Sequence, residues 1–235
     1  MPSRFCNRTF IPGCFYHVYN RGAHQQLLFR NPKDYQVFTQ ILRYYLVNPL
    51  GLAPSSKSRL DKVKNKERFF VKSPPAHALL AYCLMPNHFH FMLKQISDEI
   101  TISDLMRRVC TGYAMYFNDK YHHSGTIFQG KYKNILVENQ YQWLYLSKYI
   151  HRNPLHLQRT VLCKNLMEYP YSSYRTYLGL DQNTWINTSP ILSHTPSSKE
   201  IHSYQSFVED GSDVGNIEPY TLDTDEEQFT KNGSL

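Results

Sequence analysis

Short runs of apolar residues, bounded by turn-forming residues, predict β-strands along this chain. Residues 77–85 and 88–95 are two such runs, and Pro86-Asn87 stands between them, so we expect the two runs to form a hairpin. Two further runs, 15–21 and 131–137, predict one strand near the beginning of the chain and one after the hairpin.

Longer segments repeat their apolar side chains with the period of an α-helix. A helix is expected from Asn31-Pro32, with proline at its first position, to about Asn48. The longest helix is expected from Thr101 to about Tyr121. A third is expected over 139–153, because Asn139 is a good N-cap and the following Pro154 disfavours helix in the residue before it.

The order of these elements is β, α, β, β, α, β, α, which predicts an α+β fold: an antiparallel sheet with helices packed on it, ferredoxin-like or RRM-like. We expect one compact domain over 1–180. Within it, the segment 51–76 contains seven Lys or Arg and two acidic residues and is interpreted as a basic insertion loop. Residues 181–235 are expected to form a flexible, polar and acidic tail.

Charge is distributed unevenly along the chain. The net charge is +7, but residues 199–235 contain nine acidic residues and two lysines, so the first 198 residues have a net charge of +14. A basic body with 19 tyrosines and 13 phenylalanines suits single-stranded nucleic acid, because cations bind phosphates and aromatic rings stack on bases. The same composition is equally typical of a soluble protein with a tyrosine-rich core.

The five cysteines form no C-x-x-C pair. Their odd number and wide spacing argue against a disulfide framework and against a thiolate zinc site, and they favour a reducing compartment, for which the cytoplasm is the default. No apolar run approaches the roughly 18 residues that a membrane span needs, so no membrane association is expected.

His88 and His90 flank Phe89 inside a predicted strand. Side chains alternate between the two faces of a strand, so the two imidazoles share one face while Phe89 and Phe91 point into the core from the other. Two neutral imidazoles on one face can bind one divalent cation. Taken alone, the triplet is also compatible with ordinary half-exposed histidines.

Tyr149 and Asn153 are four residues apart near the end of a predicted helix. Residues at this spacing lie above one another on a helix, so a phenol and an amide oxygen can both reach a metal bound by the two histidines. The structural alternative is that Tyr149 is a packing residue and Asn153 a helix cap.

With both segments in view, the chain resembles the single-tyrosine HUH (IS200-like) transposases, most closely their REP-associated tyrosine transposase branch. The resemblance extends from about Phe10 to Gly179. It rests on five blocks in order, namely Phe15–Gly22, Met85–His90, Gly125–Lys133, Tyr149–Pro154 and Tyr169–Tyr174.

The resemblance implies an HUH domain that cleaves and rejoins single-stranded DNA at hairpin or palindromic repeat elements through a covalent 5′-phosphotyrosine. It implies that His88 and His90 bind a divalent metal, that Tyr149 is the nucleophile and that Asn153 is the third ligand. Imidazole and uncharged amide ligands leave coordination positions open for phosphate oxygens, so Mg²⁺ or Mn²⁺ fits better than a closed zinc site.

Basic residues near these blocks are candidates for phosphate contacts. They are Arg21, Arg107, Arg108, Lys131, Lys133 and Arg152. Lys148, His151 and Arg152 are also candidates for favouring the ionised phenol. His151 is two residues from Tyr149 and so off its helix face, but it could still border the DNA. Either a monomer or a homodimer is compatible with one nucleophile per chain.

Two other functions remain open at this stage. One is a catalytically silent protein that binds single-stranded nucleic acid. The other is a metal-dependent phosphodiesterase in which water attacks the phosphate and Tyr149 only packs.

Overall fold

The computed structural model describes residues 9–50, 74–157, 165–195 and 201–211. Apart from residues 74–76, the predicted basic insertion lies outside the described residues. Among the residues described, no helix is both long enough and apolar enough to cross a membrane. The three described cysteines, Cys14, Cys83 and Cys110, form no disulfide.

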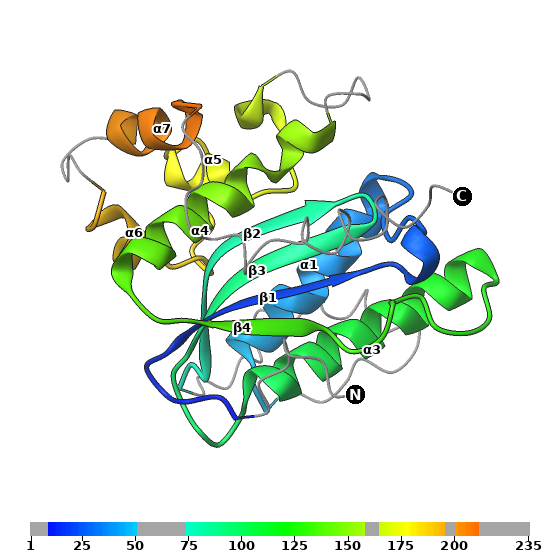
Figure 1. Ribbon diagram of the computed structural model, residues 1–235. Helices are drawn as coiled ribbons and strands as arrows, with labels where there is room; N and C mark the ends of the chain where they lie inside the picture. Colours follow the sequence, from blue (N-terminus) through cyan, green and yellow to red (C-terminus); the bar gives the residue numbers. More distant parts are fainter. Residues whose placement is uncertain (1–8, 51–73, 158–164, 196–200, 212–235) are drawn as a thin grey trace, which may run out of the picture.

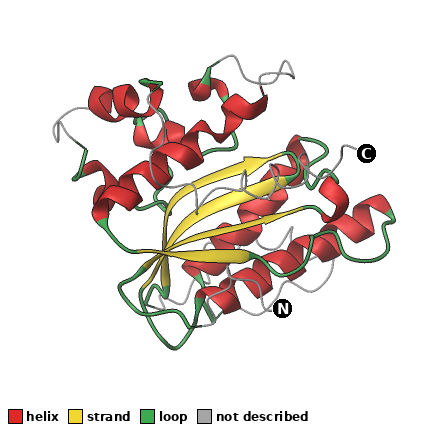
Figure 2. Ribbon diagram, in the orientation of Figure 1, coloured by secondary structure: helices red, strands yellow, loops and turns green. Residues whose placement is uncertain are grey.

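One antiparallel sheet of four strands organises the fold, in the order β2-β3-β1-β4. The strands are β1 (Phe15–Arg21), β2 (His77–Met85), β3 (His88–Gln95) and β4 (Lys133–Val137). The predicted hairpin and first strand are confirmed, and β4 begins two residues later than predicted. The sheet lies between two groups of helices (Figures 1 and 2), which confirms the predicted α+β class with an antiparallel sheet.

Helices α1 (Pro32–Val47) and α3 (Ile102–Tyr121) cover one face of the sheet. Each begins at a capping box, in which the side chain of Asn31 or Thr101 and a carboxylate three residues later exchange hydrogen bonds with the backbone. The ring of Phe38 on α1 lies 5.3 Å from that of Phe89 and 5.0 Å from that of Tyr113 on α3. The phenylalanine side of β3 therefore faces this helical layer.

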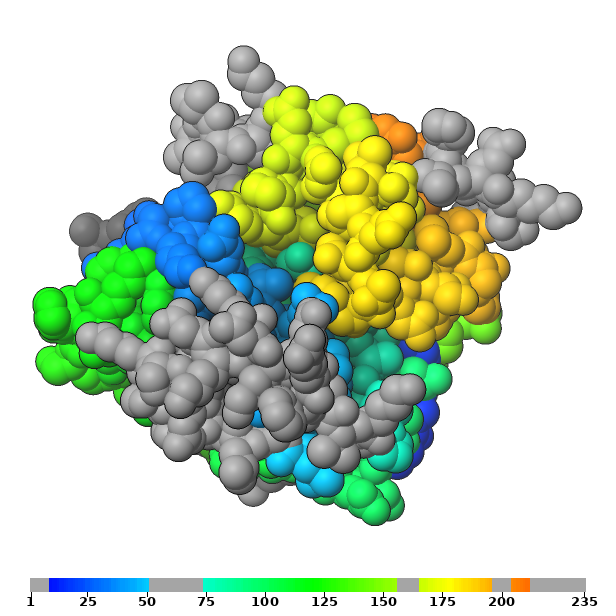
Figure 3. All heavy atoms as spheres, turned by 180° about the vertical axis from the view of Figure 1, so that it is seen from behind, coloured from blue at the N-terminus to red at the C-terminus, as the bar shows by residue number. Residues whose placement is uncertain are grey.

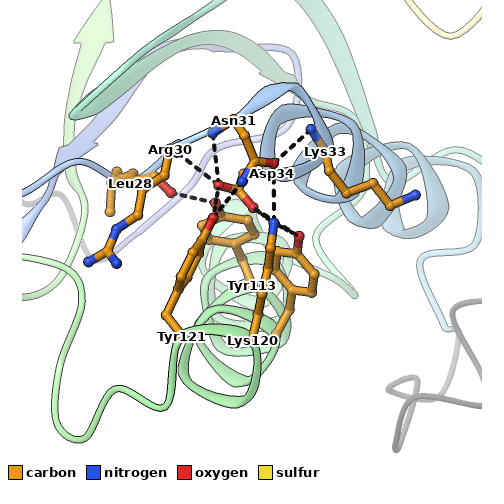
Figure 4. Close-up of polar contacts among 9 residues, drawn as sticks. Leu28, Arg30, Asn31, Lys33, Asp34, Tyr113, Lys120 and Tyr121 are labelled. Carbon is orange, nitrogen blue, oxygen red and sulfur yellow. Dashed lines mark hydrogen bonds and ion pairs between the residues drawn. The ribbon is translucent and has the colours of Figure 1, made fainter.

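A buried carboxylate joins α1 to α3 (Figure 4). Asp34 accepts hydrogen bonds from Lys120 Nζ (2.6 Å), the Tyr121 hydroxyl (2.7 Å) and the Tyr116 hydroxyl (2.9 Å). Burial alone raises the pKa of Asp34, but these donors outweigh it and hold the pKa below its ordinary value. In Figure 3 the blue surface around the start of α1 adjoins the green surface around the end of α3.

Helix α4 (Gln140–Arg152) lies on the other face of the sheet, together with α5 (Tyr174–Tyr177), α6 (Ser189–Leu192) and α7 (Ile201–Glu209). The N-cap of α4 is Asn139, as predicted, and the side chain of Asn139 accepts a hydrogen bond from the Gln142 backbone amide at 3.0 Å. Short 3₁₀ turns occur at Ala23–Gln25, Asn153–Leu157 and Leu166–Glu168.

Helix α7 falls within the segment that the sequence predicted to be a flexible tail. In the structure its Tyr204 and Val208 side chains are buried against the rest of the chain, and the Tyr204 hydroxyl donates to Ser147 Oγ on α4 at 3.0 Å. Burial of apolar side chains is what orders this segment despite its acidic neighbours.

Candidate metal and tyrosine site

The turn between β2 and β3 is fixed by backbone hydrogen bonds from the segment that follows β1. The amide of Gly22 donates to the Asn87 carbonyl at 2.7 Å, and the amides of Leu28 and Phe29 donate to the Pro86 carbonyl at 2.8 and 3.0 Å. A Cβ at Gly22 would lie 2.1 Å from the carbonyl oxygen of Gln26, so this close approach requires glycine. The start of β3 is thereby held rigidly.

His88 is the first residue of β3, and both of its ring nitrogens face oxygen atoms. Nδ1 lies 2.7 Å from the side-chain oxygen of Asn87, and Nε2 lies 3.4 Å from Oδ1 of Asn153. Both oxygens are amide acceptors and a neutral ring has one N–H, so the shorter contact assigns the proton to Nδ1, which donates it to Asn87. In the neutral ring, Nε2 then has a lone pair directed toward Asn153.

Asn153 follows the last residue of α4 and is buried. Its amide nitrogen donates to the Tyr149 carbonyl at 3.0 Å, so Oδ1 is the atom that faces His88. This contact confirms that Tyr149 and Asn153 are one helical turn apart. Two lone-pair atoms, His88 Nε2 and Asn153 Oδ1, thus face each other, and a cation between them would satisfy both. The donor set fits a divalent metal.

His90 is fully buried on the same face of β3. The centroid of its ring lies 5.1 Å from that of His88, and the two rings are nearly perpendicular, at 89°. Nδ1 of His90 lies 3.0 Å from Nε2 of His17 on β1. His17 was given no role from the sequence, because only the pairing of β1 with β3 brings it to His90.

Tyr149 lies beside the histidines. Its ring centroid is 5.4 Å from that of His90 and 6.1 Å from that of His17, with both rings nearly perpendicular to the phenol. The phenol is buried rather than displayed on the surface. The structure therefore brings the predicted nucleophile and all three predicted metal ligands together, from β3 and the end of α4.

Within the described ranges, no group of three or more His, Cys, Asp or Glu side chains is arranged to hold a metal ion. The candidate site has two histidines and an amide, and asparagine is not one of those four residue types. Any metal at this site would therefore be held by two imidazoles and a neutral oxygen, with no carboxylate to reduce its charge.

Three of the predicted DNA-binding residues lie near this site. Arg21 on β1 pairs in register with His88 on β3. Lys133 on β4 pairs with Tyr19 on β1, and Tyr19 in turn pairs with His90 on β3. Nε of Arg21 donates to the side chain of Gln129, and Lys131 is exposed beyond the start of β4. These cations border the end of the sheet that holds His88.

The other three lie elsewhere. Arg107 and Arg108 are on α3, on the opposite face of the sheet, where Arg107 pairs with Asp104 and Arg108 donates to the Pro49 carbonyl at 2.6 Å. Arg152 donates to the carbonyl of Val208 on α7 at 2.9 Å.

Two residues considered as helpers of the phenol are buried and have other partners. Lys148 is buried and pairs with Asp210, which follows α7. His151 is buried between the Tyr204 hydroxyl (2.7 Å from Nδ1) and Ser173 Oγ (2.8 Å from Nε2). Burial lowers the pKa of His151 to about 3, so its ring is neutral. The interpretation that His151 borders the DNA is corrected, because no part of this side chain is exposed.

Residues 64–153 match the family model described as "Transposase IS200 like", and this segment contains His88, His90, Tyr149 and Asn153. The resemblance to the IS200-like transposases is confirmed over this segment. The IS200-like match supports an enzyme of the transposase type.

No curated protein matched the sequence. Among solved structures, one described as a REP-associated tyrosine transposase bound to a REP hairpin is similar, with 17% sequence identity and a TM-score of 0.46. The match covers 77% of this chain and 90% of that chain.

Proposed function

We propose that this protein is a metal-dependent, single-tyrosine HUH transposase that cuts and rejoins single-stranded DNA at hairpin or palindromic repeats. The observation that supports this most directly is the meeting of the Tyr149 ring with His90, next to the facing lone pairs of His88 and Asn153. All four residues lie in the segment that matches the IS200-like transposases.

In this proposal His88, His90 and Asn153 hold Mg²⁺ or Mn²⁺. The ion, when bound, neutralises the charge that develops on the scissile phosphate. The three ligands have fixed orientations, because His90 is buried against His17, His88 is hydrogen-bonded to Asn87, and the Asn153 amide donates to the Tyr149 carbonyl. Fixed ligands need little reorganisation when the reaction occurs.

Tyr149 supplies the nucleophile. Its phenolic oxygen loses a proton and forms a bond to phosphorus, the bond from phosphorus to the 3′ oxygen breaks, and that oxygen takes up a proton. The product is a 5′-phosphotyrosine and a free 3′ hydroxyl, and attack by a 3′ hydroxyl reverses the step without an external energy source. Lys148 and His151 do not take part, because both are buried against other partners.

Arg21, Lys131 and Lys133 are the residues that we propose as contacts to the DNA backbone. They lie at the end of the sheet next to His88, whereas Arg107 and Arg108 lie behind the sheet. Phosphate contacts position the strand without reading its sequence. The proposal is compatible with a monomer or a homodimer. We also propose a reducing, cytoplasmic compartment, which suits the three described cysteines, Cys14, Cys83 and Cys110, because they form no disulfide.

The test is formation of a covalent adduct. Labelled single-stranded hairpin DNA is incubated with the full chain and Mn²⁺, and SDS-stable protein–DNA species are counted. We expect an adduct with wild type and none with Tyr149→Phe. Tyr145→Phe is the matched control, because Tyr145 lies on the same helix but contacts Tyr141 and Phe207 instead of the histidines.

Each other result favours a different function. Cleavage that survives in Tyr149→Phe would indicate attack by water and a phosphodiesterase. Binding of the hairpin by wild type, with neither cleavage nor adduct, would indicate a silent nucleic-acid-binding protein.

A further inference from the structure

His17 is a buried histidine packed among the aromatic side chains of the candidate site. Its ring is stacked on that of His90, with centroids 5.2 Å apart and planes within 17°. The ring of Tyr19 lies beside it, tilted by 32°, with centroids 4.8 Å apart. The Tyr149 ring meets it edge-on at 6.1 Å. His17 is fully buried, so its ring orientation is fixed by these neighbours.

The contact between His17 and His90 joins two ring nitrogens, Nε2 of His17 and Nδ1 of His90, at 3.0 Å. A neutral imidazole has one N–H and one lone pair, so one of these nitrogens donates and the other accepts. If His90 is to bind a metal, its lone pair must be on Nε2, because Nδ1 is already occupied by His17. The proton of His90 must then be on Nδ1, and His17 must accept it.

The same arrangement occurs on the other histidine of the pair. Nδ1 of His88 donates to the side-chain oxygen of Asn87 at 2.7 Å. Each candidate ligand thus has a partner at Nδ1, so Nε2 is the ring nitrogen that we assign to the metal. Histidines that ligate metals in proteins nearly always donate their second ring nitrogen in this way, which fixes the tautomer and makes the ligating nitrogen more basic.

We propose that His17 is a positioning residue for the metal site: it accepts the Nδ1 proton of His90 and so fixes the tautomer and the direction of the ligating Nε2. The proposal rests on the metal-dependent function proposed above. It assigns His17 no contact with metal or DNA.

A matched pair of substitutions tests the acceptor. His17→Gln puts an amide oxygen near the position of Nε2, whereas His17→Met has a similar length and shape but no strong acceptor. Mn²⁺ affinity of the full chain is measured without DNA, from the free Mn²⁺ signal in electron paramagnetic resonance. We expect His17→Met to bind Mn²⁺ about 10–100-fold more weakly than wild type. His17→Gln is expected to stay within about threefold of wild type, because the acceptor is restored.

Tyr204→Phe is the control for loss of a hydrogen bond to a buried histidine. It removes the hydroxyl that bonds His151, a histidine away from the site, and leaves the ring. We expect unchanged Mn²⁺ affinity in this variant. Thermal unfolding without metal reports the stability of every variant, and if His17→Met does not fold, His17→Phe, which keeps an aromatic ring but has no acceptor, takes its place.

Equal Mn²⁺ affinity in His17→Met and His17→Gln, whether both match wild type or both are equally weakened, would overturn the role of His17 as acceptor. The adduct assay separates this failure from failure of the function. An adduct in wild type that depends on Tyr149 and on Mn²⁺ keeps the function in place whatever His17 does. Absence of Mn²⁺ binding by wild type would remove both proposals.

Discussion

The two faces of strand β3 differ in what their buried side chains contact. On one face, Phe89 and Phe91 pack against Phe38 of α1, with ring centroids 5.3 and 6.1 Å apart. On the other, His88 and His90 contact Asn153 and His17 through ring nitrogens. One strand thus contributes alternate residues to a dry core and to a polar site.

The phenylalanine face of β3 therefore contributes mainly to stability, and the histidine face forms the candidate site. The face toward α1 and α3 contains the phenylalanine contacts of β3 and, between the two helices, the ion pair of Asp34 with Lys120. Hydrophobic burial of this kind is the main source of folding free energy. The face toward α4 buries polar ring atoms, which costs folding free energy unless these atoms are hydrogen-bonded or bind a metal. A functional strand is held in place by the residues that alternate with its functional side chains.

The largest expected effect comes from neighbouring substitutions on β3. Phe89→Ala should lower the free energy of unfolding by about 3–5 kcal/mol, because a large buried ring leaves a cavity. His88→Ala, at a half-buried position, should change the free energy of unfolding by less than about 1 kcal/mol. It should lower the rate of adduct formation by at least about 10³-fold through loss of a metal ligand. Urea unfolding and the adduct assay measure the two quantities.

The separation of stability and chemistry between the two faces of β3 would be contradicted if His88→Ala destabilised the fold as much as Phe89→Ala. Loss of Mn²⁺ binding by a folded Phe89→Ala variant would contradict this separation equally.

The next effect concerns the buried carboxylate behind the sheet. Asp34→Asn should lower the free energy of unfolding by about 3 kcal/mol, because it leaves Lys120 and two tyrosine hydroxyls without their charged acceptor. Mn²⁺ affinity should stay within about threefold of wild type, since the cluster lies in the other layer. Asp98→Asn, at an exposed carboxylate after β3, is the control and should change stability by less than about 0.5 kcal/mol. A large loss of Mn²⁺ affinity in a folded Asp34→Asn would show that the two faces are coupled.

Part of this arrangement is predictable from local sequence and part is not. The bounds of β2 and β3 follow from Pro86-Asn87 between two apolar runs, and the shared face of His88 and His90 follows from the two-residue period of a strand. Helix α4 and its end at Asn153 follow from Asn139 and Pro154. These signals lie within a few residues of the features that they predict.

The contact of His17 with His90 has no such signal, because it depends on the strand order and on the register of β1 against β3. The same is true of His151 and Lys148. Their positions on the helix were predicted, but their partners come from distant segments: Tyr204 of α7 and Ser173 for His151, and Asp210 after α7 for Lys148. The acidic composition around α7 gave no sign of its buried Tyr204 and Val208. Tertiary partners from distant segments decide which polar residues of a helix are accessible.

A comparable effect, on pH dependence, probes the buried polar groups on the outer side of α4. Burial lowers the pKa of His151 from 6.5 to about 3, so the unfolded chain binds a proton there that the folded chain does not. The stabilisation from His151 is complete above pH 6.5 and is lost as the pH falls toward 3, at up to about 1.4 kcal/mol per pH unit. Urea unfolding between pH 7.5 and pH 4 should therefore give a shallower pH dependence for His151→Gln than for wild type. Identical pH dependences in the two proteins would contradict a neutral, buried His151.

The smallest effect concerns DNA binding by cations on the two sides of the sheet. Arg21→Gln should reduce the slope of log affinity for single-stranded hairpin DNA against log salt by about 0.7, as expected for loss of one phosphate contact to a single strand. Arg107→Gln should leave the slope unchanged, because Arg107 lies on α3 behind the sheet. Fluorescence anisotropy titrations at several salt concentrations measure both. A larger reduction for Arg107→Gln than for Arg21→Gln would place the DNA on the wrong face.

The central claim is that His88, His90 and Asn153 form one metal site beside Tyr149. Crystals of the protein grown with Mn²⁺ test it directly by anomalous diffraction at the manganese absorption edge. We expect one strong anomalous peak within bonding distance of Nε2 of both histidines and of Oδ1 of Asn153, on the side of the Tyr149 ring. A peak at other residues, or no peak at this position under conditions in which Mn²⁺ supports adduct formation, would contradict the account.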